Sequence, residues 1–164
     1  MSKRIFIYRH AKSDWTADYS ADHERPLAKR GIKSAKLMGK LLKNADQLPD
    51  LIISSTAVRA LQTIELSISE ADWGMEVIQN ESLYYDSYLE IFEILKDISD
   101  DYNSVMFVGH EPKCSSLCSY LVGGGQFNFP TAAMARIDFY ETNWKSVKPS
   151  HGSVRWLLQP SFFL

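Results

Sequence analysis

Residues 5–8 of the chain are Ile5-Phe6-Ile7-Tyr8, and Arg9 and His10 follow them directly. An uninterrupted apolar run of this length predicts a strand buried on both faces, as in a parallel sheet. Open α/β sheets bind their ligands at the carboxyl ends of such strands, which is where His10 lies. The guanidinium group of Arg9 can neutralise an anion there. The junction therefore predicts an α/β fold and suggests phosphate chemistry on a histidine.

The composition is that of one globular domain, because 164 residues with 45% hydrophobic and 23% charged side chains can bury a full core. We therefore treat residues 1–164 as a single domain. No apolar stretch reaches the roughly 20 residues of a membrane span. Met1-Ser2-Lys3-Arg4 leads into a strand rather than into a signal peptide, so we expect a cytoplasmic protein. The formal net charge of −2 argues against binding to nucleic acid or an anionic membrane, so any anion must be bound by a local cluster.

Strand-like and helix-like segments alternate along the chain, which predicts a three-layer α/β/α fold with a mostly parallel sheet. The predicted strands are 4–8, 51–53, 75–78, 105–108, 133–141 and 153–158, and the predicted helices are 27–43, a segment after Thr56, 88–98 and a segment beginning at Pro112. The turn-rich link over 142–152 predicts that the last two strands pair as an antiparallel hairpin at one edge of the sheet.

The helix after the second strand is expected to be capped by residues 54–56, Ser54-Ser55-Thr56, because hydroxyl side chains accept hydrogen bonds from helix N-termini. Arg59 lies in the first turn of this helix, and Thr63 shares its side. The opposite, buried face is predicted from apolar residues spaced by four, three and four: Ala57, Leu61, Ile64 and Ile68.

Three predicted strand ends carry reactive side chains to one edge of the sheet: Arg9 and His10 after the first strand, Arg59 after the second and His110 after the fourth. Two arginines and two histidines suit a tetrahedral anion, because the planar guanidinium group matches phosphate oxygens. Zinc is the competing use of two histidines. It requires three or four ligands, and arginines would repel it, so we predict no metal.

Cys114 and Cys118 share a predicted helical face with Leu117 and Leu121. Two cysteines are too few for a metal site, and their spacing of four is poor for a disulfide. We expect both to be small core residues.

These segments resemble the histidine phosphatase superfamily, also called the phosphoglycerate mutase-like family, and within it the SixA-type phosphohistidine phosphatases. The resemblance rests on residues 9–13, 55–63 and 109–112, together with Arg25-Pro26-Leu27 before the first helix. It covers nearly the whole chain and implies the phosphoglycerate mutase-like fold. One departure is Ala11, which stands where the family usually has glycine.

By this resemblance, His10 is the nucleophile that is transiently phosphorylated, and Arg9, Arg59 and His110 bind the phosphoryl oxygens. No metal or other cofactor is implied. His10 must be neutral at one ring nitrogen to attack, whereas His110 is expected to be protonated and to add positive charge. Either nitrogen of His10 could be the attacking atom.

The family commonly has a general acid just after the third strand, which makes Glu81 the candidate here. Asp86, Asp14 and Glu111 are rival acids. A phosphohistidine substrate would depend less on an acid, because imidazole leaves readily.

Residues of the polar loop before the first helix are further candidates. Arg25 is expected either to reach the phosphate or to have a surface or helix-entry role, and Ser13 to add a hydroxyl group. His23 and His151 lie outside any matching motif, and we assign them no catalytic role.

The sequence thus predicts a phosphatase that acts on a phosphorylated histidine in a protein or on a small phosphomonoester. The short chain leaves little room for a lid over the site, which favours an open cleft. The alternatives are a phosphomutase and a non-catalytic phosphate-binding module on the same fold. The predicted partner is the phosphorylated protein or phosphate ester, and the oligomeric state is left open.

Overall fold

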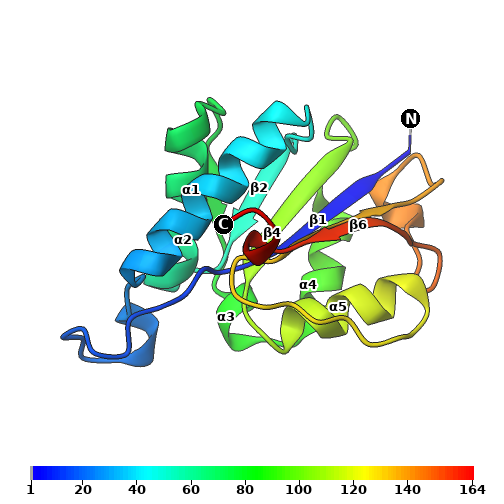
Figure 1. Ribbon diagram of the computed structural model, residues 1–164. Coiled ribbons are helices and arrows are strands. Elements are labelled where there is room, and N and C mark those ends of the chain that lie inside the picture. Colours follow the sequence, from blue (N-terminus) through cyan, green and yellow to red (C-terminus); the bar gives the residue numbers. More distant parts are fainter. Residues whose placement is uncertain (1) are drawn as a thin grey trace.

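A computed structural model describes residues 2–164, which form a six-stranded sheet between two layers of helices (Figure 1). The strand order is β3-β2-β4-β1-β5-β6. The strands are β1 (Arg4–Arg9), β2 (Leu51–Ser54), β3 (Val77–Gln79), β4 (Ser104–Gly109), β5 (Met134–Asp138) and β6 (Ser153–Leu158). The first four strands run parallel, whereas β5 is antiparallel to β1 and pairs with β6 as an antiparallel edge hairpin. The predicted fold class is confirmed.

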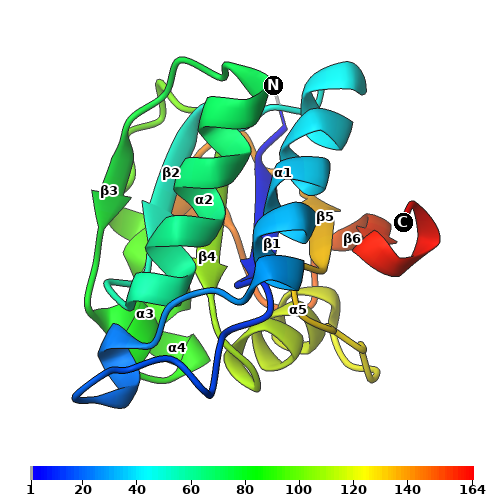
Figure 2. The same cartoon turned by 60° about the vertical axis from the view of Figure 1, so that its left-hand side comes forward.

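Two helices cover each face of the sheet. Helices α1 (Lys29–Asn44) and α2 (Val58–Ala71) pack side by side on one face, and α4 (Tyr88–Ile94) and α5 (Lys113–Val122) cover the other (Figures 1 and 2). A short helix, α3 (Ser82–Tyr85), lies between β3 and α4. Four 3₁₀ segments complete the structure: Asp22–Glu24, Leu95–Asp97, Trp144–Ser146 and Pro160–Phe162.

The apolar run of β1 is buried on both faces, as its sequence predicts. Ile5 and Ile7 belong to the core beneath α4 and α5, whereas Phe6 and Tyr8 belong to the core beneath α1 and α2. Successive side chains of a strand point to opposite faces, so every residue of the run contributes to one core or the other. This burial anchors the strand end from which Arg9 and His10 extend.

The loop from residue 11 to residue 28 crosses the carboxyl edge of the sheet and closes against the start of α1 (Figure 2). The amide of Ala28 donates a hydrogen bond to the carbonyl of Lys12 at 2.9 Å. A Cβ atom at Gly31 would lie 2.1 Å from that carbonyl oxygen, so only glycine allows the helix to approach the loop so closely. Glycine is a poor helix former, but at position 31 it lets α1 pack against the loop after His10.

Several predicted boundaries are wrong by a few residues. The third strand begins at Val77 rather than Met75, the predicted helix 88–98 ends as a 3₁₀ turn, and α3 replaces part of a predicted loop. Pro112 precedes α5 as its N-cap residue and is not its first helical residue. The core beneath α4 and α5 contains Cys114 and Cys118 as free thiols, as predicted.

The predicted cap of α2 is wrong. Ala57 is the N-cap residue, and its side chain makes no capping hydrogen bond. The hydroxyl groups of Ser55 and Thr56 are paired with His110 and His23.

The predicted buried face of α2 is right at Ala57 and Ile64, which are fully buried, and wrong at Leu61 and Ile68, which are only partly buried. The buried residues of the helix are Arg59, Ala60, Thr63, Ile64 and Ser67.

No helix within residues 2–164 is long and apolar enough to cross a lipid bilayer.

Candidate active site

The carboxyl edge of the parallel strands carries a cavity of about 220 Å³. The end of β1 supplies Arg9 and His10, the first turn of α2 supplies Arg59, and the end of β4 supplies His110. The structure therefore brings these four residues together around one cavity, as predicted. The full lining consists of Arg9, His10, Lys12, Ser13, Trp15, Arg25, Arg59, His110, Glu111 and Thr131.

The His10 side chain is buried, and its tautomer is set by the backbone. Nδ1 lies 2.7 Å from the carbonyl oxygen of Ala11, which can only accept, so Nδ1 carries the proton. The lone pair of the neutral ring is then on Nε2. Burial lowers the pKa of His10 to about 4; the bond to Ala11 opposes this shift, and the charges of Arg59, Arg9 and Arg25 add to it. His10 is thus neutral near pH 7 with a nucleophilic Nε2.

Ala11 fills the position of the expected glycine without strain. Its φ is not positive, and its amide donates a hydrogen bond to the Thr63 hydroxyl at 2.9 Å. The Thr63 hydroxyl in turn donates to the carbonyl of Arg59 at 2.6 Å. This chain of bonds ties the loop after His10 to the turn of α2 that carries Arg59.

His110 is buried beside His10, with ring centroids 5.2 Å apart. Burial lowers its pKa far below the ordinary value, and the charges on His10, Arg59 and Lys113 add to the shift while Asp22 opposes it. The direction of this shift contradicts the prediction that His110 is protonated.

A neutral His110 can still be a donor. Its Nε2 lies 2.7 Å from the hydroxyl oxygen of Ser55, which also accepts a hydrogen bond from the amide of Ala57 at 3.2 Å. With that amide as one partner, the Ser55 hydroxyl is free to donate to Nε2. When the hydroxyl donates in this way, the proton of the neutral ring is on Nδ1, an atom that is buried and has no partner within residues 2–164.

The two arginines from the strand ends are held by their terminal nitrogens. Arg9 donates from Nη1 to the carbonyl of Phe129 at 2.7 Å. Arg59 donates from Nη1 to the backbone carbonyl of Asp22 at 2.7 Å and from Nη2 to its carboxylate at 3.0 Å. In both arginines Nε is buried and unpaired in the part of the chain that the structure describes.

Three buried donors therefore lack an acceptor: Nε of Arg9, Nε of Arg59 and Nδ1 of His110. An unsatisfied buried donor is costly, and in folded proteins such a group is paired with a protein atom, a ligand, a water molecule or an ion. All three residues line the same cavity as His10. The arrangement can bind a tetrahedral oxyanion against the imidazole.

Arg25 and Ser13 also belong to the cavity. Arg25 is buried rather than on the surface, donates from Nη1 to the Ser13 hydroxyl and lies with Cζ 3.6 Å from the centre of the Trp15 ring. The surface role considered for Arg25 is therefore excluded, and both residues line the cavity with His10.

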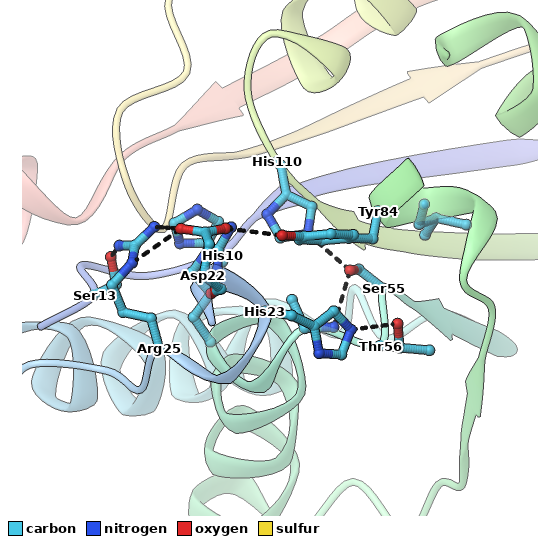
Figure 3. Close-up of polar contacts among 12 residues, drawn as sticks. His10, Ser13, Asp22, His23, Arg25, Ser55, Thr56, Tyr84 and His110 are labelled. Carbon is cyan, nitrogen blue, oxygen red and sulfur yellow. Dashed lines mark hydrogen bonds and ion pairs between the residues drawn. The ribbon is translucent and has the colours of Figure 1, made fainter. Parts of the chain in front are cut away.

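Sequence reasoning missed Asp22, which joins the arginines to the opposite wall of the site (Figure 3). Its carboxylate accepts from Arg25 at 2.8 Å, from Arg59 at 3.0 Å and from the Tyr84 hydroxyl at 2.9 Å. Partial burial raises the pKa of Asp22, but these hydrogen bonds and the Arg59 charge outweigh it and hold the pKa well below its usual range. The only signal in the sequence is the spacing of three between Asp22 and Arg25.

Tyr84 and His23 form the wall next to Asp22. The His23 ring lies 4.8 Å from the Tyr84 ring, and its Nε2 lies 2.8 Å from the Thr56 hydroxyl (Figure 3). Tyr84 also packs edge-on against His110 at 5.4 Å. His23 thus supports the site, although it does not line the cavity and the sequence offered no motif for it.

The candidate acids lie in different places. Glu81 is exposed just before α3 and does not line the cavity, whereas Glu111 does. The Glu111 carboxylate accepts a hydrogen bond from the Ser115 hydroxyl at 2.7 Å in the first turn of α5. Asp14 accepts from Thr16 within the exposed loop.

Comparison with known proteins agrees with this architecture. Residues 5–84 match the model of the histidine phosphatase superfamily (branch 1). The uncharacterized protein ML1117 of Mycobacterium leprae is 34% identical over 139 residues, which cover 77% of this chain and 84% of that protein.

Two solved structures share the fold over nearly their whole length. The protein histidine phosphatase SixA, complexed with tungstate, has a TM-score of 0.85 at 22% identity, with 98% of this chain and 99% of that chain covered. The SixA protein of Agrobacterium tumefaciens has a TM-score of 0.81 at 26% identity, with 96% and 99% covered. With its sequence relatives, its fold and its strand-end arginines and histidines, the chain belongs to the histidine phosphatase superfamily.

Proposed function

We propose that the protein is a phosphatase that forms a covalent phosphohistidine on His10. The observation that carries the proposal is the set of three unpaired buried donors on Arg9, Arg59 and His110 around a neutral imidazole. The fold shared with the protein histidine phosphatase SixA supports the same activity.

In the first step, Nε2 of His10 attacks phosphorus as the bond to the leaving group breaks. The leaving group departs with the electron pair of that bond and takes up a proton. In the second step, water attacks phosphorus and the P–Nε2 bond breaks, which releases inorganic phosphate and restores neutral His10. Splitting one displacement into two in this way is the general advantage of covalent catalysis.

The donors on Arg9, Arg59 and His110 would bind the equatorial oxygens, where negative charge is concentrated during transfer. Arg25 and Ser13 would extend this binding to the loop side of the cavity. The tautomer of His10 supports Nε2 as the attacking atom, because Nδ1 is held by the Ala11 carbonyl at 2.7 Å. The arginines supply the positive charge that metal ions supply in many other phosphoryl-transfer enzymes, so the proposal includes no metal or other cofactor.

We propose a phosphohistidine in a protein or a small phosphomonoester as the substrate. The SixA protein that shares this fold was solved with tungstate, a tetrahedral oxyanion of the shape expected in the cavity here. The general acid remains a prediction. Glu81 retains that role only if the loop before α3 brings its exposed carboxylate to the leaving group, and replacement of Glu81 by Gln would test it with an alkyl phosphate.

Trapping the labelled enzyme tests the proposal directly. The protein is mixed with a phosphorylated substrate, quenched in alkali and digested, and the phosphorylated peptide is located by mass spectrometry. We expect the phosphoryl group on His10 and at least a thousandfold loss of kcat for His10→Ala, with His151→Ala, an exposed histidine, as the matched control. Undiminished hydrolysis by His10→Ala would exclude this mechanism.

A further inference from the structure

Asp22 bonds to both arginines that approach the cavity from the loop side and from α2. It uses two different groups: its backbone carbonyl accepts from Nη1 of Arg59 at 2.7 Å, and its carboxylate accepts from Nη2 of the same residue at 3.0 Å. The other carboxylate oxygen accepts from Nη2 and Nε of Arg25 at 2.8 and 3.3 Å. One residue of the loop therefore fixes the planes of two guanidinium groups.

The side-chain nitrogens of Arg59 differ in whether they have a hydrogen-bond partner. Both terminal nitrogens are bound to Asp22, and Nε is left buried and unpaired within the described residues. Arg9 is held at one terminal nitrogen, since Nη1 is bound to the carbonyl of Phe129 while Nε is buried and has no partner there. An oxyanion that binds the free Nε groups would not need to displace the Asp22 carboxylate.

The carboxylate is also anchored on its far side. The Tyr84 hydroxyl donates to it at 2.9 Å, and the Tyr84 ring packs against His110 (Figure 3). Lys113 donates to the backbone carbonyl of Tyr84 and so holds the end of α3. Asp22 therefore joins the loop, α2 and α3 around the cavity, although its own side chain is 49% exposed whereas that of Arg59 is 7% exposed.

We propose that Asp22 is a positioning residue, which orients Arg59 and Arg25 so that Nε of Arg59 is available to the transferring phosphoryl group. This inference rests on the proposed phosphatase function. A flexible arginine must lose side-chain freedom when it binds an anion, and one already held by two acceptors has lost it beforehand. The arrangement stabilises the transition state more than it strengthens substrate binding in the ground state, because the charge and shape of the phosphoryl group change during transfer.

Two other roles for Asp22 predict different behaviour. A carboxylate that merely occupied the arginines in the empty site would compete with phosphate, and its removal would strengthen binding of the anion. A carboxylate that donated a proton to the leaving group would act without Arg59, and its removal would cost the same whether or not Arg59 is present.

The test compares Asp22→Ala and Asp22→Asn with Asp18→Asn, an exposed carboxylate of the same loop. The substrate is p-nitrophenyl phosphate, and the inhibitor is inorganic phosphate. We expect Asp22→Ala to lower kcat at least tenfold with less than a threefold change in KM, Asp22→Asn to lose less because it keeps one acceptor oxygen, and Asp18→Asn to match the parent protein.

A double-mutant cycle with Arg59→Ala separates positioning from direct action. If Asp22 acts through Arg59, the cost of Asp22→Ala is at least fivefold smaller in the Arg59→Ala background than in the parent protein. An undiminished cost there, a kcat within twofold of the parent, or tighter phosphate inhibition with faster turnover would each overturn the proposal. Should Asp22→Ala fail to fold, Asp22→Asn carries the same cycle. Activity that persists in His10→Ala would instead overturn the proposed function, whatever the Asp22 variants do.

Discussion

The imidazole rings of His10 and His110 lie 5.2 Å apart, yet their polar partners lie on different parts of the chain. His10 is bound through Nδ1 to the carbonyl of the next residue, and His110 through Nε2 to a hydroxyl 55 residues away in the sequence. The two rings therefore leave different nitrogens unpaired within the described residues: Nε2 of His10, which carries a lone pair, and Nδ1 of His110. Two residues of one type are given opposite roles by their neighbours.

The depressed pKa of His10 predicts how activity depends on pH. Its value of about 4 keeps the nucleophile neutral well below the pH at which a free imidazole would be protonated. We expect kcat/KM for an aryl phosphate to have no protonation step near pH 6.5 that belongs to free His10, and to fall only as the pH approaches 4. A clear loss of kcat/KM centred at pH 6.5, measured with a substrate that does not titrate near that pH, would contradict this assignment.

The same shift predicts how stability depends on pH. Because the folded protein binds the His10 proton more weakly than the unfolded chain does, the unfolded state is favoured as the pH falls from about 6.5 to about 4. His10 alone accounts for about 3 kcal/mol of that loss, an order-of-magnitude figure from the shift in pKa. The free energy of unfolding, measured by urea denaturation at several pH values, should fall less steeply with decreasing pH for His10→Asn than for the parent protein. Equal slopes would mean that His10 is not buried as described.

Ser55→Ala should impair catalysis more than folding. The substitution removes the hydroxyl group that faces Nε2 of His110 and accepts from the Ala57 amide, so the tautomer with a proton on Nδ1 loses its support. We expect kcat to fall about tenfold or more, in line with the loss of a preorganised hydrogen bond. Steady-state kinetics with p-nitrophenyl phosphate measures the effect. Ser69→Ala, at an exposed hydroxyl near the end of α2, is the control and should leave kcat unchanged.

Removing the buried side chain of Arg59 should lower kcat/KM more than removing an exposed arginine does. Arg59→Ala deletes one of the three unpaired donors and is expected to lower kcat/KM by roughly a hundredfold to a thousandfold. Arg155→Ala, whose side chain is 60% exposed at the far edge of the sheet, should change kcat/KM less than twofold. A loss smaller than tenfold for Arg59→Ala would mean that this guanidinium group does not contact the phosphoryl group.

Alanine substitutions at two glycines of α1 distinguish an effect on stability from an effect on the geometry of the site. A Cβ atom at Gly31 would lie 2.1 Å from the Lys12 carbonyl, and one at Gly39 would lie 2.3 Å from the Ser67 carbonyl. Both Gly→Ala variants should therefore be destabilised, despite the gain of about 1 kcal/mol in helix propensity. Only Gly31→Ala should also lower kcat, because only Gly31 contacts the loop that leads from His10. Thermal unfolding and steady-state kinetics measure the two effects, and an unchanged kcat in Gly31→Ala would show that the loop absorbs the shift.

Much of the fold follows from local patterns. The continuous apolar runs of β1 and β4 and the alternation of strands with helices predict a parallel sheet, and the carboxyl ends of parallel strands meet at one edge. The convergence of Arg9, His10, Arg59 and His110 could therefore be predicted before any coordinates were known. The buried face of α2 could not, because Thr63 and Ser67 are polar and only their hydrogen bonds to Arg59 and Tyr8 make them acceptable inside.

The sequence by itself determined that Arg9 and His10 follow a buried strand at the carboxyl edge of the sheet, because both features depend on residues adjacent in the chain. Tertiary structure alone decided the protonation and partners of these groups. Burial and nearby positive charges lower the pKa of His110, and Asp22, Tyr84 and Ser55 enter the site through contacts between segments 37 to 62 residues apart. Hydrogen bonds and desolvation depend on distances in the folded chain, and no spacing in the sequence encodes them.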